Sequence, residues 1–269
     1  MSAVKFGFIG CGNMGSALAK AVCRSQGGGN VLLSDISINK AELLSQELGS
    51  LCADTASVAT NAKYIFLGVK PQVMPELTKE LTPIFENRKD RFVLITMAAG
   101  VKISSICNYF GKSYPIIRIM PNTPVSVAKG MILYTTSKEV LDEEINDFCM
   151  AIEFAGKLDK IDEEFIDAAS ALSGCGPAFV YMFAESLANA GEKCGLTREK
   201  ALLYASQTLS GAAELLLTSN KNPSVLREEV CSPGGSTIEG VRKLENNGFN
   251  SAVIEAVEAS FKRTKELGK

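Results

Sequence analysis

The sequence contains no histidine among its 269 residues. Without an imidazole, neither a Ser-His-Asp triad nor a Cys-His pair can form, and a dehydrogenase that passes its proton through histidine is excluded. Any proton transfer must therefore use a carboxylate, lysine, tyrosine, cysteine, a hydroxyl or water. The familiar zinc sites also lack their ligand spacing, because the eight cysteines form no Cys-x-x-Cys pair. We expect no metal site, and thiols that are mostly reduced.

Long runs of like charge and long apolar runs are absent too. The net charge of −2 creates no basic field for nucleic acid. The longest apolar stretch, Phe92–Val101, is too short to span a bilayer. We therefore expect no nucleic-acid partner, no membrane segment and, by default, a cytoplasmic location. The hydrophobic content of 46% and the charged content of 22% are ordinary for a soluble globular protein of one or two domains.

The most informative stretch present is a glycine motif near the N-terminus. An apolar run, Val4–Ile9, leads into Gly-x-Gly-x-x-Gly, and a helical pattern follows at once. Such a turn brings the free N–H groups of a helix N-terminus close to a pyrophosphate. The alternative is an ordinary glycine-rich turn, but the flanking strand and helix patterns favour a dinucleotide site. Its residues are Gly10, Cys11, Gly12, Asn13, Met14 and Gly15.

Asp35 is the candidate for the ribose of the cofactor. It follows a second apolar run, Val31–Ser34, and stands about 20 residues after Gly15, where a ribose-binding carboxylate belongs. A carboxylate repels a 2′-phosphate, and no arginine follows within the next few residues, so the residues alone favour NAD over NADP. The alternative is that Asp35 merely caps the turn before the next helix.

Strands and helices alternate over residues 1–161, which predicts a Rossmann-like, doubly wound and mostly parallel sheet. Helical patterns alone follow over residues 162–269, which predicts an all-α domain. Within it, Ala178–Ala184 is apolar on every side. Because a small domain can hardly bury such a helix by itself, we expect a homodimer formed through these helices, with a monomeric bundle as the alternative.

Ligands of open α/β sheets bind at the carboxyl ends of the strands. Small or rigid residues follow three of the predicted strands there, and they leave room for the nicotinamide and its ribose. The alternative is plain turn chemistry. The cofactor candidates from these segments are Val69, Lys70, Pro71, Ala98, Ala99, Gly100 and Asn122.

The helical region has two polar, glycine-rich interruptions, Ser173–Pro177 and Ser232–Thr237. The second precedes a helix, where free N–H groups and hydroxyls could bind a small carboxylate. The alternative is a capping box made by Ser236 and Glu239, in which Ser236 itself saturates those amides. The residues alone do not decide between carboxylate binding and a capping box.

Six motifs occur together and in order: Gly10–Gly15, Val69–Pro71, Ala98–Val101, Met120–Pro124, Leu172–Ala178 and Ser232–Ile238. With these motifs the whole chain resembles the pyrroline-5-carboxylate reductases. The resemblance implies reduction of 1-pyrroline-5-carboxylate to L-proline, the last step of proline biosynthesis, by NADPH or NADH. It also implies interlocked helical domains in a dimer, and assembly of dimers into decamers.

The resemblance further implies site residues in the helical region. The loop Ser232–Thr237 would hold the carboxylate and the ring nitrogen of the substrate. Thr237 would be the hydroxyl closest to the substrate and is the catalytic candidate. The loop could serve the cofactor site of the partner subunit. The substrate-binding candidates are Ser173, Ser232, Gly235, Ser236 and Thr237. Three positions depart from the family's common pattern. Asp35 replaces a residue suited to NADP, Thr55 stands where an asparagine often reaches the adenosine, and Asn220 stands where some members carry a glutamate near the substrate.

Two other functions compete with this one. A 3-hydroxyacid dehydrogenase would also join a Rossmann domain to a helical one, but its lysine base in a glycine-rich helix is missing, since Pro177 and Ala178 occupy the comparable stretch. A non-catalytic dinucleotide sensor would keep the first motif, but it would not need the second glycine-rich loop.

Overall fold

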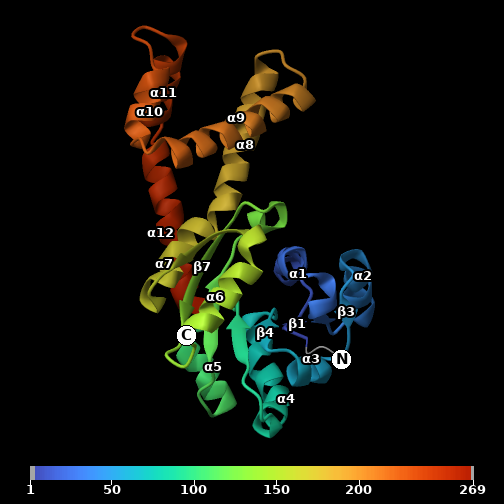
Figure 1. The fold of residues 1–269 in the computed structure, drawn as a ribbon. Helices are drawn as coiled ribbons and strands as arrows, with labels where there is room; N and C mark the ends of the chain where they lie inside the picture. Colours follow the sequence, from blue (N-terminus) through green and yellow to red (C-terminus); the bar gives the residue numbers. More distant parts are fainter. Residues whose placement is uncertain (1–3, 268–269) are drawn as a thin grey trace. The chain divides into compact units, whose positions relative to one another are not determined.

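The structure is a computed structural model that describes residues 4–267. The chain forms two compact units, drawn in Figure 1. The first comprises Met1–Gly174 together with Ser260–Lys269, and the second comprises Cys175–Ala259. The outermost residues of both predicted domains, 1–3 and 268–269, lie outside the described residues.

The first unit is built on one eight-stranded sheet with the order β3-β2-β1-β4-β5-β6-β7-β8. All neighbouring strands are parallel except β6 and β7. The doubly wound, mostly parallel sheet predicted from the sequence is therefore confirmed. The strands are β1 (Phe6–Ile9), β2 (Val31–Ser34), β3 (Leu51–Cys52), β4 (Tyr64–Leu67), β5 (Val93–Thr96), β6 (Ile116–Met120), β7 (Gly130–Thr136) and β8 (Gly156–Lys160).

Helices cover both faces of this sheet (Figure 1). One face packs against α1 (Asn13–Gln26), α2 (Ile38–Leu48) and α6 (Asp142–Ala151). The other packs against α3 (Thr55–Asn61), α4 (Met74–Asn87) and α5 (Ile103–Phe110). The central strands β1 and β4 are apolar along their whole length, and every residue in them is buried. Stacking of Phe8 on Phe66, with ring centroids 4.2 Å apart, joins β1 to β4 at the centre.

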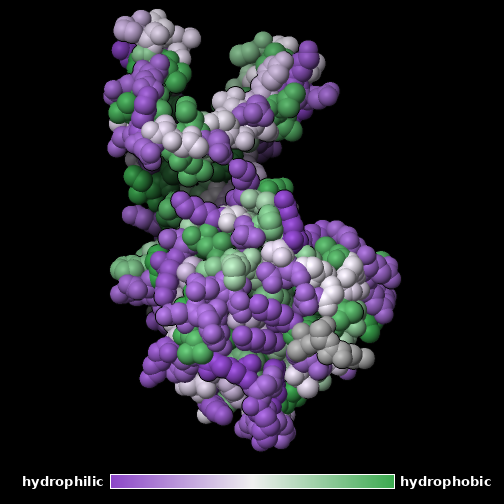
Figure 2. Space-filling view, viewed as in Figure 1, coloured by the Kyte–Doolittle hydropathy of each residue, from purple (hydrophilic) through white to green (hydrophobic). Residues whose placement is uncertain are grey.

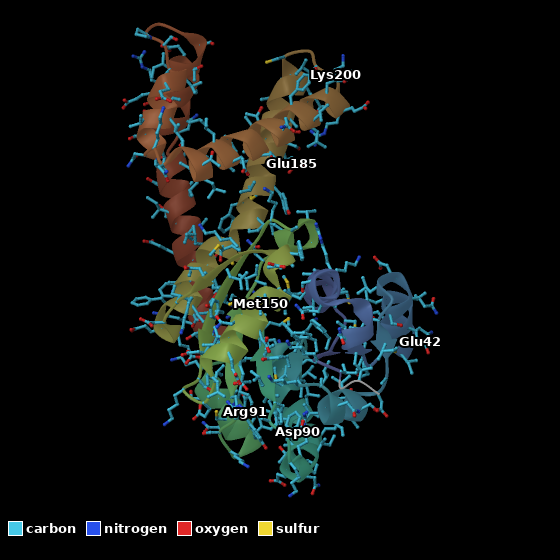
Figure 3. All side chains as sticks on the ribbon, in the orientation of Figure 1. Glu42, Asp90, Arg91, Met150, Glu185 and Lys200 are labelled. Atoms are coloured by element: carbon cyan, nitrogen blue, oxygen red, sulfur yellow. The ribbon has the colours of Figure 1, made fainter. Side chains whose placement is uncertain are left out.

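Ion pairs hold the amino-terminal edge of the sheet, opposite the predicted cofactor edge. Arg91, labelled in Figure 3, lies just before β5 and donates two hydrogen bonds to the buried carboxylate of Glu144 on α6. Asp147, on the same helix, accepts hydrogen bonds from Lys5 and from the Tyr64 hydroxyl. Burial, and then this bond to Asp147, raise the pKa of Tyr64 well above its usual value. The ion pairs at this end of the sheet therefore have a structural role.

Helix α7 (Glu163–Ser173) packs against β7 and belongs to the first unit. Its Ile166 is fully buried with Met120 and Leu133 of the sheet. The compact unit thus extends past residue 161, where the sequence places the end of the first domain. The division of the chain into domains 1–161 and 162–269 stays a prediction. By its packing, α7 belongs with the sheet.

The second unit is all helical, as predicted. It contains α8 (Gly176–Lys193), α9 (Arg198–Ser219), α10 (Pro223–Val230), α11 (Ser236–Asn246) and the first part of α12 (Phe249–Leu267). Gly191 allows α8 and α9 to pack closely, since a Cβ there would meet the Cβ of Ala201 at 3.0 Å. No helix among the described residues is long and apolar enough to cross a membrane.

Candidate functional site

The glycine motif forms the turn between β1 and α1, and each glycine has a separate geometric reason. Gly10 has φ +103°, and a Cβ there would lie 2.6 Å from the carbonyl oxygen of Gly68. A Cβ on Gly15 would lie 2.1 Å from the carbonyl oxygen of Gly10. These two positions therefore admit only glycine, because the backbones of β1, α1 and the segment after β4 touch.

Gly12 differs from its two neighbours in the motif. It is the N-cap of α1, and a Cβ there would meet no atom within 4 Å. No side chain among the described residues caps α1. The first N–H groups of the helix thus face open space across a glycine without a side chain, which is the arrangement that binds a pyrophosphate.

Asp35 directly follows β2 beside this turn, and both of its carboxylate oxygens accept hydrogen bonds. Oδ2 accepts the N–H of Cys11 at 2.7 Å, and Oδ1 accepts the N–H of Ser37 at 3.0 Å. Asp35 therefore caps the turn before α2, which is the alternative role that the sequence allows for it. A carboxylate has further lone pairs, so it can also accept from ribose hydroxyls. The two readings are compatible, and the ribose role of Asp35 stays a prediction.

Two other side chains line this corner of the sheet. Burial, and then the Asp35 carboxylate, raise the pKa of Cys11 to about 11, so the thiol is neutral at pH 7 and acts as an apolar filler. Thr55, the first residue of α3, shares a hydrogen bond of 2.9 Å between its hydroxyl and that of Ser34. This bond places Thr55 beside the end of β2.

The remaining cofactor candidates follow β4 and β5 at the same edge, since these strands run parallel to β1. After β4, Lys70 precedes a short 3₁₀ turn that begins at Pro71. After β5, Gly100 adopts φ +75°, and the N–H of Val101 returns to the carbonyl of Ala98. The topology thus brings Val69, Lys70, Pro71, Ala98, Ala99 and Gly100 to the edge that carries Gly10–Gly15.

Asn122, after β6, is buried and bridges two backbone segments. Its Nδ2 donates to the carbonyl of Ser173 at 2.9 Å, and its Oδ1 accepts the N–H of Met131 at 2.9 Å. The hydroxyl of Ser173 itself donates to Ala169. A hydrogen bond therefore brings together two predicted site residues, Asn122 and Ser173. Their contacts with a ligand stay predictions.

The second glycine-rich loop lies in the helical unit, and the capping box, one of the two alternatives for it, is not formed. Helix α11 begins at Ser236, its N-cap is Gly235, and no side chain among residues 4–267 forms a cap bond there. The N–H of Gly235 instead closes a turn on the carbonyl of Ser232 at 2.9 Å. Glu239, the supposed partner of Ser236, pairs with Arg242.

Loss of the capping box leaves the first turn of α11 without a side-chain acceptor. Ser236 and Thr237 are its first two residues, and both are exposed. The alternative in which Ser236 saturates the amides therefore fails, and the loop can present backbone N–H groups and hydroxyls to a small anion.

The helices of this unit expose a large apolar surface. Within the described residues 175–259, only Ala188, Ala201 and Ala205 are buried. Tyr181 and Met182, in the run predicted to be buried, are 63% and 68% exposed, and apolar patches are visible over these helices in Figure 2. A hollow of about 340 Å³ between α8 and α12 is lined almost entirely by apolar side chains, among them Phe179 and Phe249. Such an apolar surface is typical of a subunit interface.

Sequence reasoning missed Arg118 and Glu163. The Arg118 side chain is fully buried within β6 and pairs with Glu163 and Asp167 of α7. The signal was present, because a single arginine interrupts the apolar run Ile116–Met120. A buried guanidinium requires carboxylate partners, but the sequence alone does not say which ones.

Known proteins resemble this chain over its full length. A family model described as pyrroline-5-carboxylate reductase dimerisation matches residues 163–267, and one described as NADP oxidoreductase coenzyme F420-dependent matches residues 5–100. The pyrroline-5-carboxylate reductase of Escherichia coli K12 is 38% identical, covering 98% of each chain.

Solved structures agree with this. A pyrroline-5-carboxylate reductase from Coxiella burnetii superposes with a TM-score of 0.90, at 31% identity and with 100% of each chain covered. The Plasmodium falciparum enzyme, solved with NADP bound, has a TM-score of 0.88 at 31% identity, again with 100% of each chain covered.

Fold and site together define a dinucleotide-binding oxidoreductase with a Rossmann-type sheet and a helical dimerisation region. The full-length relatives make the assignment narrower. The chain belongs to the pyrroline-5-carboxylate reductase family.

The geometry of the turn separates the roles of two glycines. Because a Cβ on Gly12 would meet no atom of the described residues within 4 Å, Gly12→Ala should leave the melting temperature unchanged and weaken NADPH binding by about tenfold or more, by blocking the pyrophosphate. Gly15→Ala should lower the melting temperature as well, since its Cβ meets the carbonyl of Gly10. Thermal denaturation and titration of NADPH fluorescence measure both effects. Normal NADPH affinity in Gly12→Ala would contradict the predicted phosphate site.

Proposed function

We propose that this protein reduces 1-pyrroline-5-carboxylate to L-proline with NAD(P)H. The observation that carries the proposal is full-length similarity to pyrroline-5-carboxylate reductases, joined to a chain that has both the open phosphate turn at Gly12 and the uncapped first turn of α11.

The residues present fit a nicotinamide dinucleotide. The uncapped start of α1 would hold the pyrophosphate, Asp35 the adenosine ribose, and Ala98–Gly100 the nicotinamide end. When bound, the reduced cofactor supplies the hydride. The role of the chain is then to place the substrate carbon against the nicotinamide ring and to hold the substrate carboxylate.

A chain without histidine suits this reaction. The ring imine of the substrate is protonated in solution, so hydride transfer needs no strong general acid from the protein. Positioning and electrostatics are sufficient, and the loop Ser232–Thr237 offers backbone N–H groups and hydroxyls for the substrate carboxylate. A 3-hydroxyacid dehydrogenase would instead need a base, and no lysine stands in the comparable stretch at Pro177 and Ala178.

The chain carries the family's dimerisation region, and the exposed apolar surface of α8, α9 and α12 suits a homodimer with interlocked helices. In such a dimer the loop could serve the partner's cofactor site. We further propose that the dimers assemble into larger particles such as decamers, and that the protein is cytoplasmic. The family resemblance of the sequence supports the decamer.

The direct test is a reductase assay. Adding pyrroline-5-carboxylate to the protein with NADPH or NADH should cause a fall in the absorbance of the reduced nicotinamide, and the product should be L-proline. A protein that binds NADPH but oxidises neither cofactor would favour the non-catalytic sensor instead.

Thr237 is proposed as the hydroxyl closest to the reacting substrate. Thr237→Ala should lower kcat by about tenfold or more, because it removes a hydrogen bond that positions the imine, and should change the KM for cofactor little. Thr218→Ala, a matched change at an exposed hydroxyl that only bonds back along α9, serves as the control. Equal losses in kcat and in cofactor affinity would argue against a substrate role for Thr237.

Asp35 is proposed to set the preference between the cofactors. Its charge opposes the 2′-phosphate of NADPH, so Asp35→Asn should raise the ratio of kcat/KM with NADPH to kcat/KM with NADH by about tenfold. Asp54→Asn is the control, because the Asp54 carboxylate also accepts a nearby backbone N–H, that of Ser57, but this bond is at the start of α3 and not with the glycine turn. An unchanged ratio in Asp35→Asn would show that its role is only to cap the turn.

A further inference from the structure

Glu163 stands where three elements of the first unit meet. It is the first residue of α7, and its Oε1 accepts two hydrogen bonds from other elements. The N–H of Ile103, which begins α5, donates at 2.7 Å, and Nη1 of Arg118 on β6 donates at 3.1 Å. One carboxylate oxygen therefore joins α5, α7 and the sheet.

Helix α5 has no cap of its own. Its N-cap residue is Lys102, which makes no side-chain cap bond. The carboxylate of Glu163 supplies what a local aspartate or serine would normally provide, and its negative charge also suits the positive end of the helix dipole. The N-terminus of α5 is thus held by a residue 60 positions later in the chain.

Arg118 fixes Glu163 in turn. Its side chain is fully buried, and its two carboxylate partners are Glu163 and, through Nη2, Asp167 at 3.0 Å. Its Nε has no partner among the described residues. A buried guanidinium that is already short of one partner is costly to separate from a carboxylate, and movement of Glu163 would leave Nη1 of Arg118 without its carboxylate, with only Asp167 still paired.

The segment that depends on this contact is the loop between β5 and α5. It contains Ala98–Gly100, and it is held by Thr96 of β5 at one end and by the capped Ile103 at the other. Between them the N–H of Val101 donates to the carbonyl of Ala98 and closes the turn, and the N–H of Ala98 donates to the Thr96 hydroxyl at 3.4 Å. A shift at the start of α5 would therefore be transmitted directly to Ala99 and Gly100.

We propose that Glu163 is a positioning residue for the nicotinamide end of the cofactor, which acts by holding the start of α5 and, through it, the loop Ala98–Gly100. The proposal rests on the proposed function, because it takes that loop as part of the cofactor site. It goes further by assigning a cofactor-side role to a helix that lies outside the glycine motif.

The test compares two carboxylates that share one arginine. Glu163→Ala and Asp167→Ala each remove one partner of Arg118, but only Glu163 also caps α5. Both variants should have lower melting temperatures. Only Glu163→Ala should raise the Kd for NADPH, by roughly fivefold, as followed by the fluorescence of the bound cofactor.

Glu163→Gln is the conservative variant, since its amide oxygen can still accept from Ile103. Its Kd for NADPH should lie between those of the wild type and Glu163→Ala, and it provides the measurement if Glu163→Ala does not fold. Equal weakening by Glu163→Ala and Asp167→Ala, or weakening by neither, would overturn the positioning role while wild-type binding stands. Failure of the wild type to bind NADPH or NADH would overturn the proposed function and this inference with it.

Discussion

Close contact between three stretches of backbone at the end of β1 is the constraint on which the cofactor site depends. Gly10 touches the segment after β4, and Gly15 brings α1 against Gly10. Because no side chain separates them, the first turn of α1 lies directly over the gap between β1 and β4, where the strand order changes direction. The phosphate binding proposed at this point would therefore be a property of the backbone, and it would require no charged side chain.

The helical unit, in contrast to the sheet, can hardly bury its apolar residues by itself. Almost nothing in it is buried in one chain, although its helices are rich in leucine, valine and aromatic residues. Exposure of such an apolar surface to water is unfavourable in free energy, and packing against a second copy of the chain can remove that surface from water. Dimerisation is thus part of the stability of the α8–α12 region and is not only a means of assembly.

The parts of the structure that depend on local chemistry were predictable from the sequence. The glycine turn, the alternation of apolar strands with helices and the helices of the second unit follow from glycine spacing and periodicity. Strand β3 and helix α3 could not be predicted in this way, because Leu51–Cys52 and Thr55–Asn61 are too short to show a period. The capping box failed because Ser236 and Glu239 have the same spacing whether Ser236 precedes or begins the helix, and the backbone of Gly235 decides between the two.

Long-range pairing was the part that local patterns could not reveal, and α7 shows why it matters. By sequence this helix begins the region that matches the family's dimerisation model, yet by packing it belongs to the sheet. Arg118 of β6 bonds to the first turns of α7, and Asn122, in the segment after β6, bonds to its last residue, so the helix is held at both ends. Each bond joins residues at least 45 positions apart. A substitution in α7 should therefore be judged first by what it does to the cofactor edge, although its place in the sequence suggests a role in dimerisation.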